Sequence, residues 1–268
     1  MSSIPSDLAP EVIARSLRAQ RIGRSLQVLA EVGSTNDVAM TAGRDGEPEG
    51  LTVLADRQTA GRGRRGRHWA SAPGVGLYLS VLLRPSLPPR HMPLIGLLAG
   101  LAVADAFEEV AGLCPGLKWP NDVQLRGKKV AGILPELAAD GPSESHVVLG
   151  IGLNLNHHAA DFPQEVRGEA TSLLLETGRA YHRGVVAGAV LNALDRWYQR
   201  FCGWEFPAIL ATYRRRSATL GRRVEVREEG EHWRGEAMDV DPDGALLVRV
   251  PAGVVRRVLA GDVSIRDH

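Results

Sequence analysis

The spacing of apolar residues divides the chain into two parts that predict different architectures. In the first part, short β-rich runs such as L-T-V-L-A-D (51–56) and L-Y-L-S-V-L-L-R (77–84) alternate with longer segments whose apolar residues recur at helical spacing. We expect helices over three of these segments, residues 8–18, 92–110 and 185–202. This pattern predicts an α+β domain over residues 1–216, with a mixed β-sheet and helices packed on one side of it.

The pattern changes after about residue 217, where apolar residues fall into short alternating runs. Examples are R-R-V-E-V-R-E (222–228) and A-L-L-V-R-V (245–250), and the sequence D-P-D-G (241–244) between such runs is typical of a turn. We therefore predict a small all-β domain over residues 217–268.

Composition is that of a globular protein large enough for one sizeable domain and one small one. The chain has 268 residues, of which 44% are hydrophobic, and its formal net charge is only +1. The first twenty residues contain acids and arginines where a signal peptide would need an apolar segment. No apolar stretch reaches the length of a membrane span. These features predict a cytoplasmic protein with no membrane partner.

The cysteines and histidines do not suggest a metal site. Cys114 and Cys202 are the only cysteines, and no C-x-x-C pair or Cys/His cluster occurs. The adjacent His157 and His158 are interpreted as an exposed pair in a loop. We therefore expect neither a disulfide framework nor a protein-bound metal ion.

Positive charge is concentrated in one segment of an otherwise balanced chain. No acidic residue occurs between Asp56 and Asp105, a segment that contains seven arginines. Four of them alternate with glycines in T-A-G-R-G-R-R-G-R-H-W (59–69). Glycine weakens helices and exposes backbone N–H groups, so this arrangement predicts an anion-binding loop rather than a solvated basic face.

The same loop contains G-x-G-x-x-G, but it does not match a dinucleotide fingerprint. That fingerprint must open a helix and must be followed about twenty residues later by an acid. Here Ser71, Pro73, Gly74 and Gly76 exclude the helix, and the acid is absent. No G-x-x-x-x-G-K-[ST] occurs either, so a P-loop is also excluded.

Four further segments place polar groups beside predicted strands: S-T-N (34–36), K-W-P-N-D (118–122), K-K-V-A-G-I-L (128–134) and G-I-G-L-N-L-N (150–156). Each has a simple structural interpretation. Ser34 could be a helix N-cap, the Asn-Asp pair a β-turn, and the glycines of the last segment a place of close backbone approach. Taken singly, none of these segments predicts a function.

Taken in order, these segments and the arginine loop resemble one family, the biotin protein ligases, also called biotin–[acetyl-CoA-carboxylase] ligases. The resemblance covers residues 33–156, with a weaker match at A-T-S-L-L-L-E-T-G (170–178). It implies a class II synthetase-like catalytic fold followed by a small SH3-like β-barrel. It also implies that biotin and ATP give biotinyl-adenylate and pyrophosphate, and that a lysine of a biotin carrier domain then attacks the adenylate.

The resemblance assigns roles to individual residues. It makes the following residues biotin contacts: Ser34, Thr35, Asn36, Gln58, Arg62, Gly63, Arg64 and Lys129. On the nucleotide side it places Arg64, Arg67, Trp69, Asn121 and Asn154, with Trp69 over the adenine. A tryptophan in the hydrophobic core is the alternative for Trp69.

Catalysis would depend on charge and positioning, with no enzyme nucleophile. We expect Arg64 and Lys129 to stabilise the biotin carboxylate and the α-phosphorus during adenylation. Asp122 is the candidate to orient the attacking lysine and help remove its proton, against the alternative of a purely structural turn residue. Magnesium is expected with the ATP phosphates, and no protein carboxylate site for it stands out.

The expected partner is a biotin carboxyl carrier protein domain of a biotin-dependent carboxylase. DNA is not expected as a partner, because only 32 residues precede Gly33 and a DNA-reading domain needs more. A weak homodimer, the acceptor's identity and the order of biotin and ATP binding are left open. The rival interpretations are a lipoate or octanoyl ligase or transferase of the same fold, and a nucleic-acid-binding module that uses the arginines.

The composition of the loop also leads to an expectation about its motion. Arginines close together repel one another, and ordering glycines is costly in entropy. We therefore expect residues 58–71 to be mobile without ligand and to close over biotinyl-adenylate as a lid.

Overall fold

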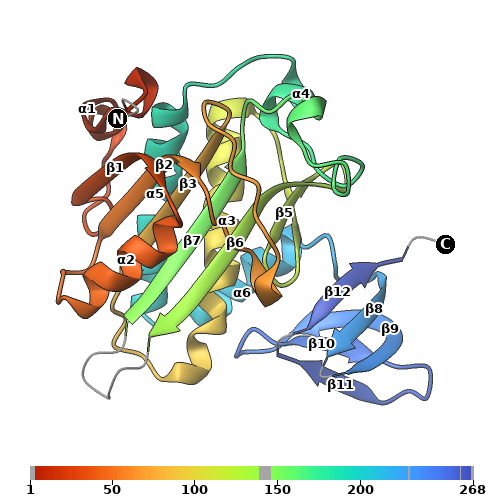
Figure 1. The fold of residues 1–268 in the computed structure, drawn as a ribbon. Coiled ribbons are helices and arrows are strands. Elements are labelled where there is room, and N and C mark those ends of the chain that lie inside the picture. The colour runs from red at the N-terminus through yellow and green to blue at the C-terminus, as the bar shows by residue number, and fades with distance from the viewer. Residues whose placement is uncertain (1–3, 139–145, 229, 260, 267–268) are drawn as a thin grey trace.

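A seven-stranded mixed sheet forms the centre of the first part of the chain (Figure 1). The computed structural model describes residues 4–138, 146–228, 230–259 and 261–266. The strands lie in the order β1-β2-β3-β7-β6-β5-β4, and only β1 and β2 pair in parallel. Their bounds are β1 Ser25–Val32, β2 Leu51–Gln58, β3 Gly76–Leu83, β4 Gly116–Lys118, β5 Asp122–Leu125, β6 Lys128–Ala138 and β7 His146–Asn154. The mixed sheet expected from the sequence is confirmed.

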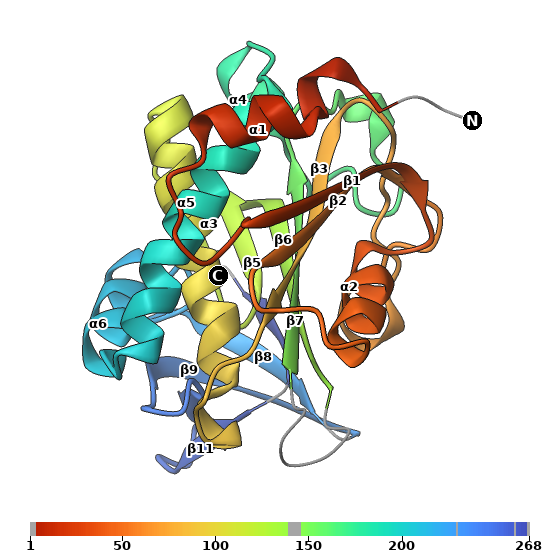
Figure 2. The ribbon, with the colours of Figure 1, turned by 90° about the vertical axis from the view of Figure 1, so that its left-hand side faces the viewer.

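Helices cover both faces of this sheet, unequally, whereas the sequence analysis expected them on one side only. Those of four or more residues are α1 Pro10–Ser16, α2 Thr35–Arg44, α3 Pro93–Ala111, α4 Leu173–Thr177, α5 Arg183–Cys202 and α6 Phe206–Arg216. Short 3₁₀ turns are η1 Ser6–Leu8, η2 Arg64–Gly66, η3 Pro89–His91 and η4 Ala159–Asp161. Figure 2 shows α3 and α5 on one face and α2 alone on the other.

The two long helices follow from the sequence. The helix expected over 92–110 is α3, which begins at a proline and ends where Gly112 adopts a left-handed conformation with φ of 65°. The helix expected over 185–202 is α5. Both contribute to the main hydrophobic cluster, together with the central strands β3 and β7. Burial of this apolar surface is the main stabilising contribution to the domain.

A second, five-stranded antiparallel sheet follows the last helix. Its strands lie in the order β11-β10-β9-β8-β12. Their bounds are β8 Arg223–Glu228, β9 Glu231–Val240, β10 Leu246–Arg249, β11 Val255–Val258 and β12 Asp262–Ile265. Apolar side chains of this sheet, such as Val226 and Val248, belong to the same hydrophobic cluster as the helices. The small β unit is thus packed against the larger part of the chain.

Two helices differ from expectation. The segment expected as one helix over 8–18 forms η1 and the shorter α1, because Ala9 is extended and Pro10 starts a new helix. Helix α6 was not foreseen, and its sequence ends in three consecutive arginines that mask the apolar period. Within the described residues, we find no helix that combines the length and the apolar character of a membrane span.

Candidate active site

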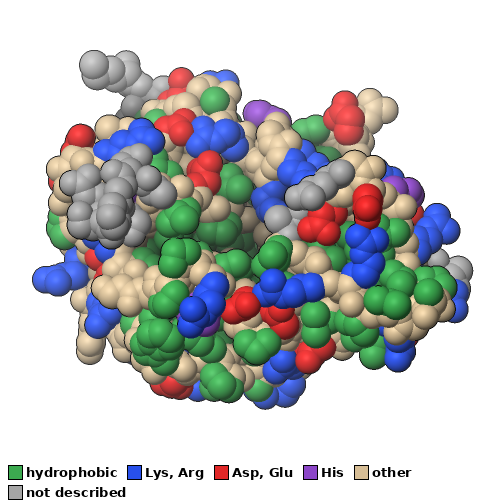
Figure 3. Space-filling model, turned by 90° about the horizontal axis from the view of Figure 1, so that it is seen from below, with side chains coloured by type: hydrophobic (Ala, Val, Ile, Leu, Met, Phe, Trp, Pro, Cys, Tyr) green, Lys and Arg blue, Asp and Glu red, His purple; other side chains and the backbone are tan. Residues whose placement is uncertain are grey.

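One cavity of about 710 Å³ brings together every site residue expected from the sequence. It lies on the face of the sheet that carries α2 and extends to β12 of the C-terminal sheet. This volume is within the usual range for a small-molecule site. The molecular face in Figure 3 is hollowed, with hydrophobic side chains in the depth of the hollow and charged side chains beside it.

One end of the cavity is a network of hydroxyl and amide groups. Gln58 Oε1 accepts hydrogen bonds from the backbone N–H and the hydroxyl of Thr35, at 2.9 and 3.1 Å. Ser80 Oγ lies 2.7 Å from Thr35 Oγ1 and 2.5 Å from Asn36 Oδ1. Thr35, Asn36 and Ser80 are buried, and buried polar groups with such partners keep a fixed orientation. This end can therefore present defined donors and acceptors to a ligand.

Helix α2 supplies part of this network. Ser34 occupies its N-cap position in extended conformation, as expected, although the Ser34 side chain makes no capping hydrogen bond. The serine hydroxyl, which lines the cavity, is thus not used by the helix. A Cβ atom on Gly150 would lie only 2.3 Å from Asn36 Oδ1, so this strand position needs a glycine.

Arg62 of the loop is held by carboxylates. Its guanidinium donates to both oxygens of Asp37, at 2.8 and 2.7 Å, and contacts Glu136 at 3.4 Å. The hydrogen bond to Asp37 raises the pKa of Arg62 above its ordinary value. Glu136 also accepts a hydrogen bond of 2.5 Å from Asn36 Nδ2. The loop is in this way connected to the polar end of the cavity.

The other arginines of the loop face the C-terminal sheet. Arg64 Nη1 lies 3.5 Å from Asn121 Oδ1 and 3.4 Å from the carbonyl oxygen of Gly261, and burial lowers the pKa of Arg64. Arg67 forms an ion pair with Asp262, and Arg65 lies 3.7 Å from the same carboxylate. An anionic ligand that binds Arg65 or Arg67 would therefore compete with the Asp262 carboxylate for them.

These ion pairs correct one premise of the sequence analysis. The loop arginines were expected to repel one another with little compensation. Asp37, Glu136 and Asp262 compensate this repulsion, and all three lie outside the acid-free segment 57–104. The loop also has local backbone order, since Gly63 N–H donates to the Arg67 carbonyl at 2.7 Å. The expected closure as a lid remains a prediction.

Lys129 and Asp122 both line the cavity and form a close ion pair, with 2.6 Å between Nζ and Oδ1. Strands β5 and β6 pair side by side and bring the two residues together. The Lys129 ammonium also lies 5.3 Å from the centre of the Trp69 ring. The Lys129 ammonium thus lies next to both the Asp122 carboxylate and the Trp69 ring.

The Trp69 ring packs against strands β6 and β7. Cβ atoms built on Gly132 and Gly152 would lie 2.7 and 2.5 Å from its ring, so both glycines are needed to seat it. The backbone N–H of Trp69 donates to the Gly61 carbonyl at 2.9 Å, which fixes the end of the loop. Asn154, the last residue of β7, donates from Nδ2 to the Thr171 carbonyl at 3.1 Å. Asn154 thereby ties the neighbouring segment to the sheet.

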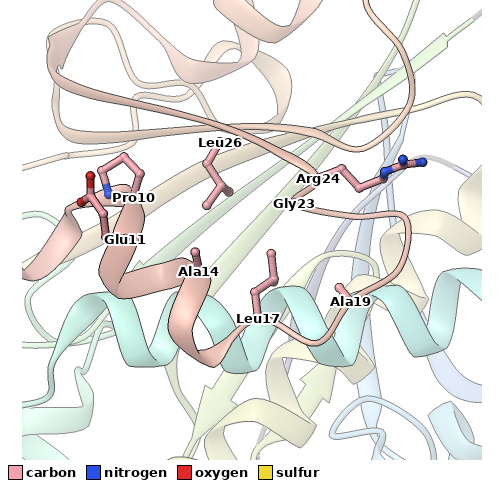
Figure 4. A pocket seen from close by; sticks show the side chains of 8 residues that line it. All are labelled: Pro10, Glu11, Ala14, Leu17, Ala19, Gly23, Arg24 and Leu26. Carbon is pink, nitrogen blue, oxygen red and sulfur yellow. The ribbon is translucent and has the colours of Figure 1, made fainter.

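Two other kinds of site receive no support. Among the residues with described positions, no group of three or more His, Cys, Asp or Glu is arranged to hold a metal. A second hollow of about 550 Å³ lies between α1 and β1, lined mainly by small and apolar side chains, with Glu11 and Arg24 far apart in it (Figure 4). It contains none of the expected site residues.

Comparison with known proteins identifies the family. Residues 30–154 match the biotin/lipoate A/B protein ligase family, and residues 219–266 match the biotin protein ligase C terminal domain. The chain is 40% identical to the biotin--[acetyl-CoA-carboxylase] ligase of Mycobacterium tuberculosis, over 96% of either chain. The chain belongs to the biotin protein ligase family.

Other biotin protein ligases extend the likeness to structure. The bifunctional ligase/repressor BirA of Bacillus subtilis is 33% identical over 97% of this chain and 80% of its own length. The biotin protein ligase from Aquifex aeolicus, solved in complex with biotin and ATP, superposes with a TM-score of 0.79. It is 33% identical and is covered over its full length, against 91% of this chain. The fold expected from the sequence is thereby confirmed.

One wall of the cavity was missed by the sequence analysis. Residues 162–170 contribute Phe162, Pro163, Val166 and Glu169 to the lining. The expectation of an exposed His157–His158 pair is wrong for His157, which is 2% exposed and stacks on Phe162 at 5.1 Å between ring centres. One sequence signal was present, since Phe162 lies only five residues beyond His157 in a segment with few other aromatics.

Burial of His157 predicts a pH dependence of stability. Burial lowers the pKa of His157 to about 4, whereas an unfolded histidine titrates near its ordinary value. Because the unfolded chain binds the proton more readily, stability falls as pH drops from about 6.5 towards 4. We expect urea unfolding to show a loss of about 2 kcal/mol between pH 7.5 and pH 5. Replacing His157 with glutamine should remove this component, and an unchanged pH dependence in that variant would refute its origin in His157.

Proposed function

We propose that this protein attaches biotin to one lysine of a biotin carboxyl carrier domain, through a biotinyl-5′-adenylate intermediate formed from ATP. The observation that carries the proposal is one cavity, polar at one end and basic at the other, lined by every residue expected for biotin and nucleotide. The Aquifex aeolicus relative, solved with biotin and ATP, supports the same two substrates here. The lipoate alternative is not retained, since residues 219–266 match a domain of biotin protein ligases.

At the polar end, Ser34, Thr35, Asn36 and Gln58 would bind the ureido ring of biotin. That ring has N–H donors and a carbonyl acceptor, which hydroxyl and amide groups can match. Burial of these groups makes a wrong ligand costly, because it would leave them without partners. Specificity for biotin would therefore reside in this network.

Adenylation would take place beside Lys129 and Arg64. The biotin carboxylate attacks the α-phosphorus of ATP, a P–O bond to the leaving pyrophosphate breaks, and both reactants are anionic. Two cations, Lys129 and the half-buried Arg64, would offset the repulsion and stabilise the charge on phosphorus. Arg62 and Gly63 would close the biotin side, and Arg67, Trp69, Asn121 and Asn154 the nucleotide side. Magnesium would accompany the ATP phosphates as part of the substrate.

In the second step, the amine of the acceptor lysine attacks the biotinyl carbonyl and AMP leaves. A free lysine is almost wholly protonated at neutral pH, so one proton must first be removed. Asp122 would attract the incoming ammonium and help to remove that proton.

We further propose residues 1–216 as the catalytic domain and residues 217–268 as the C-terminal domain. Because the reaction consumes ATP, we propose the cytoplasm as its compartment.

Glycine at position 150 should be required for biotin binding. In Gly150→Ala, the new methyl group would displace Asn36 at the polar end of the cavity. We expect biotin affinity to fall about tenfold, within the range known for small overpacking changes. Gly168→Ala is a matched control, because nothing lies within 4 Å of a Cβ atom there. Wild-type affinity in Gly150→Ala, measured by titration calorimetry, would remove Asn36 from the biotin site.

Biotin and ATP should protect the arginine loop from trypsin. The ligand oxygens would replace exposed carboxylates as partners of Arg62 and Arg67, whose side chains are 37% and 69% exposed. Cleavage after Arg62, Arg64, Arg65 and Arg67 is expected to be faster without ligand, and faster still at high salt, which screens exposed ion pairs. Equal protection with and without ligand would show that the ion pairs alone preform the loop.

Calorimetric titration separates the ligase from a nucleic-acid-binding protein. The protein is titrated with biotin, and separately with single-stranded DNA and RNA at two salt concentrations. We expect a saturable heat with biotin that changes little with salt. A salt-dependent heat with nucleic acid and none with biotin would instead support a phosphate-binding module.

A further inference from the structure

Trp119 connects the K-W-P-N-D segment to the C-terminal sheet. Its side chain is 2% exposed, and its indole Nε1–H donates to the carbonyl oxygen of Gly244 at 3.0 Å. Its backbone N–H donates to Thr219 Oγ1 at 2.9 Å. Both acceptors belong to the C-terminal part of the chain, while Trp119 itself lines the active-site cavity. One buried side chain thus spans the two parts.

The acceptor Gly244 is itself firmly held. It lies in the turn between β9 and β10, where its φ of 87° favours glycine. A Cβ atom at this position would lie 3.2 Å from Leu94 Cδ2 at the start of α3. The turn is closed by a hydrogen bond of 2.9 Å from Gly244 N–H to the Asp241 carbonyl. The Gly244 carbonyl that accepts the indole hydrogen bond is therefore held in a fixed position against α3.

The residues directly after Trp119 reach into the cavity. Asn121 is hydrogen-bonded to β6 through both its side chain and its carbonyl oxygen, each at 3.0 Å to Ile133. Asp122 forms the ion pair with Lys129. The turn is therefore supported by β6 on one side and by the C-terminal sheet, through Trp119, on the other.

We propose that Trp119 is a positioning residue for adenylation, which fixes the K-W-P-N-D turn against the C-terminal sheet and so sets Asn121 relative to the nucleotide. This inference rests on the proposed ligase function. The polar end of the cavity, proposed for the ureido ring, is formed by α2, β2, β3, β6 and β7, which do not include the turn. Loss of the connection should therefore affect ATP more than biotin.

Trp119→Phe tests the proposal, since it removes the indole N–H and leaves an aromatic ring in the core. Arg214→Ala is the matched control. Arg214 also joins the two parts of the chain, from α6 to Asp239 and to the Val240 carbonyl, each at 2.6 Å, but it does not contact the turn. Both variants remove hydrogen bonds between the catalytic part and the C-terminal sheet. Only Trp119→Phe removes one made by the K-W-P-N-D segment.

We expect Trp119→Phe to lower kcat/KM for ATP in pyrophosphate release by about tenfold, while biotin affinity stays within about twofold of wild type. Arg214→Ala should keep both quantities within about twofold of wild type, even where its melting temperature falls. The proposal is overturned if Trp119→Phe keeps wild-type ATP kinetics, or if Arg214→Ala loses as much as Trp119→Phe.

Hydrogen exchange provides a readout that does not depend on activity. Backbone amides of residues 117–125 should exchange faster in Trp119→Phe than in wild type, and at the wild-type rate in Arg214→Ala. Thr219→Val, which removes the second acceptor with little change of shape, should also speed exchange there. Unchanged exchange in both Trp119→Phe and Thr219→Val would refute the positioning role. A wild-type protein that releases no pyrophosphate with biotin and ATP would instead refute the ligase function, and the exchange result would still decide the positioning.

Discussion

Replacing Lys129 with alanine is expected to slow biotinyl-adenylate formation roughly 150-fold, which corresponds to about 3 kcal/mol of transition-state stabilisation. The reason is electrostatic: Lys129 lines the cavity in which two anionic reactants must meet, and its removal also leaves Asp122 without this partner. The rate is measured by single-turnover pyrophosphate release at saturating biotin and ATP.

The neighbouring Lys128 provides the control for this experiment. It is exposed at the start of β6 and does not line the cavity. Lys128→Ala should therefore behave as wild type, and Lys129→Arg should recover part of the rate by keeping the charge. Equal rates in Lys129→Ala and wild type would remove Lys129 from the mechanism.

Replacing Asp122 with asparagine is expected to slow biotin transfer to the carrier lysine by at least about 100-fold, as for the loss of a general base. The amide keeps the shape of the side chain but can neither attract an ammonium nor accept its proton. Adenylation should fall much less, because Lys129 and Arg64 remain. Transfer is measured with adenylate already formed on the enzyme, by following biotin on the carrier domain.

The pH profile distinguishes a base from a structural turn residue. If Asp122 helps to deprotonate the lysine, transfer in Asp122→Asn should recover as pH rises and the free amine becomes abundant. Equal losses in both half-reactions at all pH values would favour the structural role of Asp122 and contradict the assignment.

Sequence alone predicted much of the fold because its signals are local. The apolar spacing of α3 and α5 persists over five turns or so and is little affected by neighbours, so both helices were correctly placed. The strands β2 and β3 were equally clear as short apolar runs. Helix α6 and the break at Pro10 were not, since three arginines in one and a proline in the other interrupt the local pattern.

The expected site residues line one cavity, but their partners were not foreseen. Ser80 was hidden as a single polar residue in an apolar strand, and it meets Thr35 and Asn36 only through the pairing of distant segments. Glu136 and Asp262 reach the loop arginines from 74 and 195 residues away. No local pattern encodes such contacts, because they depend on which strands become neighbours in the folded protein.

The central claim is tested most directly by incubating the protein with biotin, MgATP and an isolated biotin carrier domain, and recording the mass of the carrier. The account predicts one added biotin on one lysine, ATP-dependent and accompanied by an equal amount of pyrophosphate. Lipoate or octanoate in place of biotin should leave the carrier mass unchanged. A carrier that gains lipoyl or octanoyl groups, or that gains nothing with biotin while the protein is folded, would contradict the account.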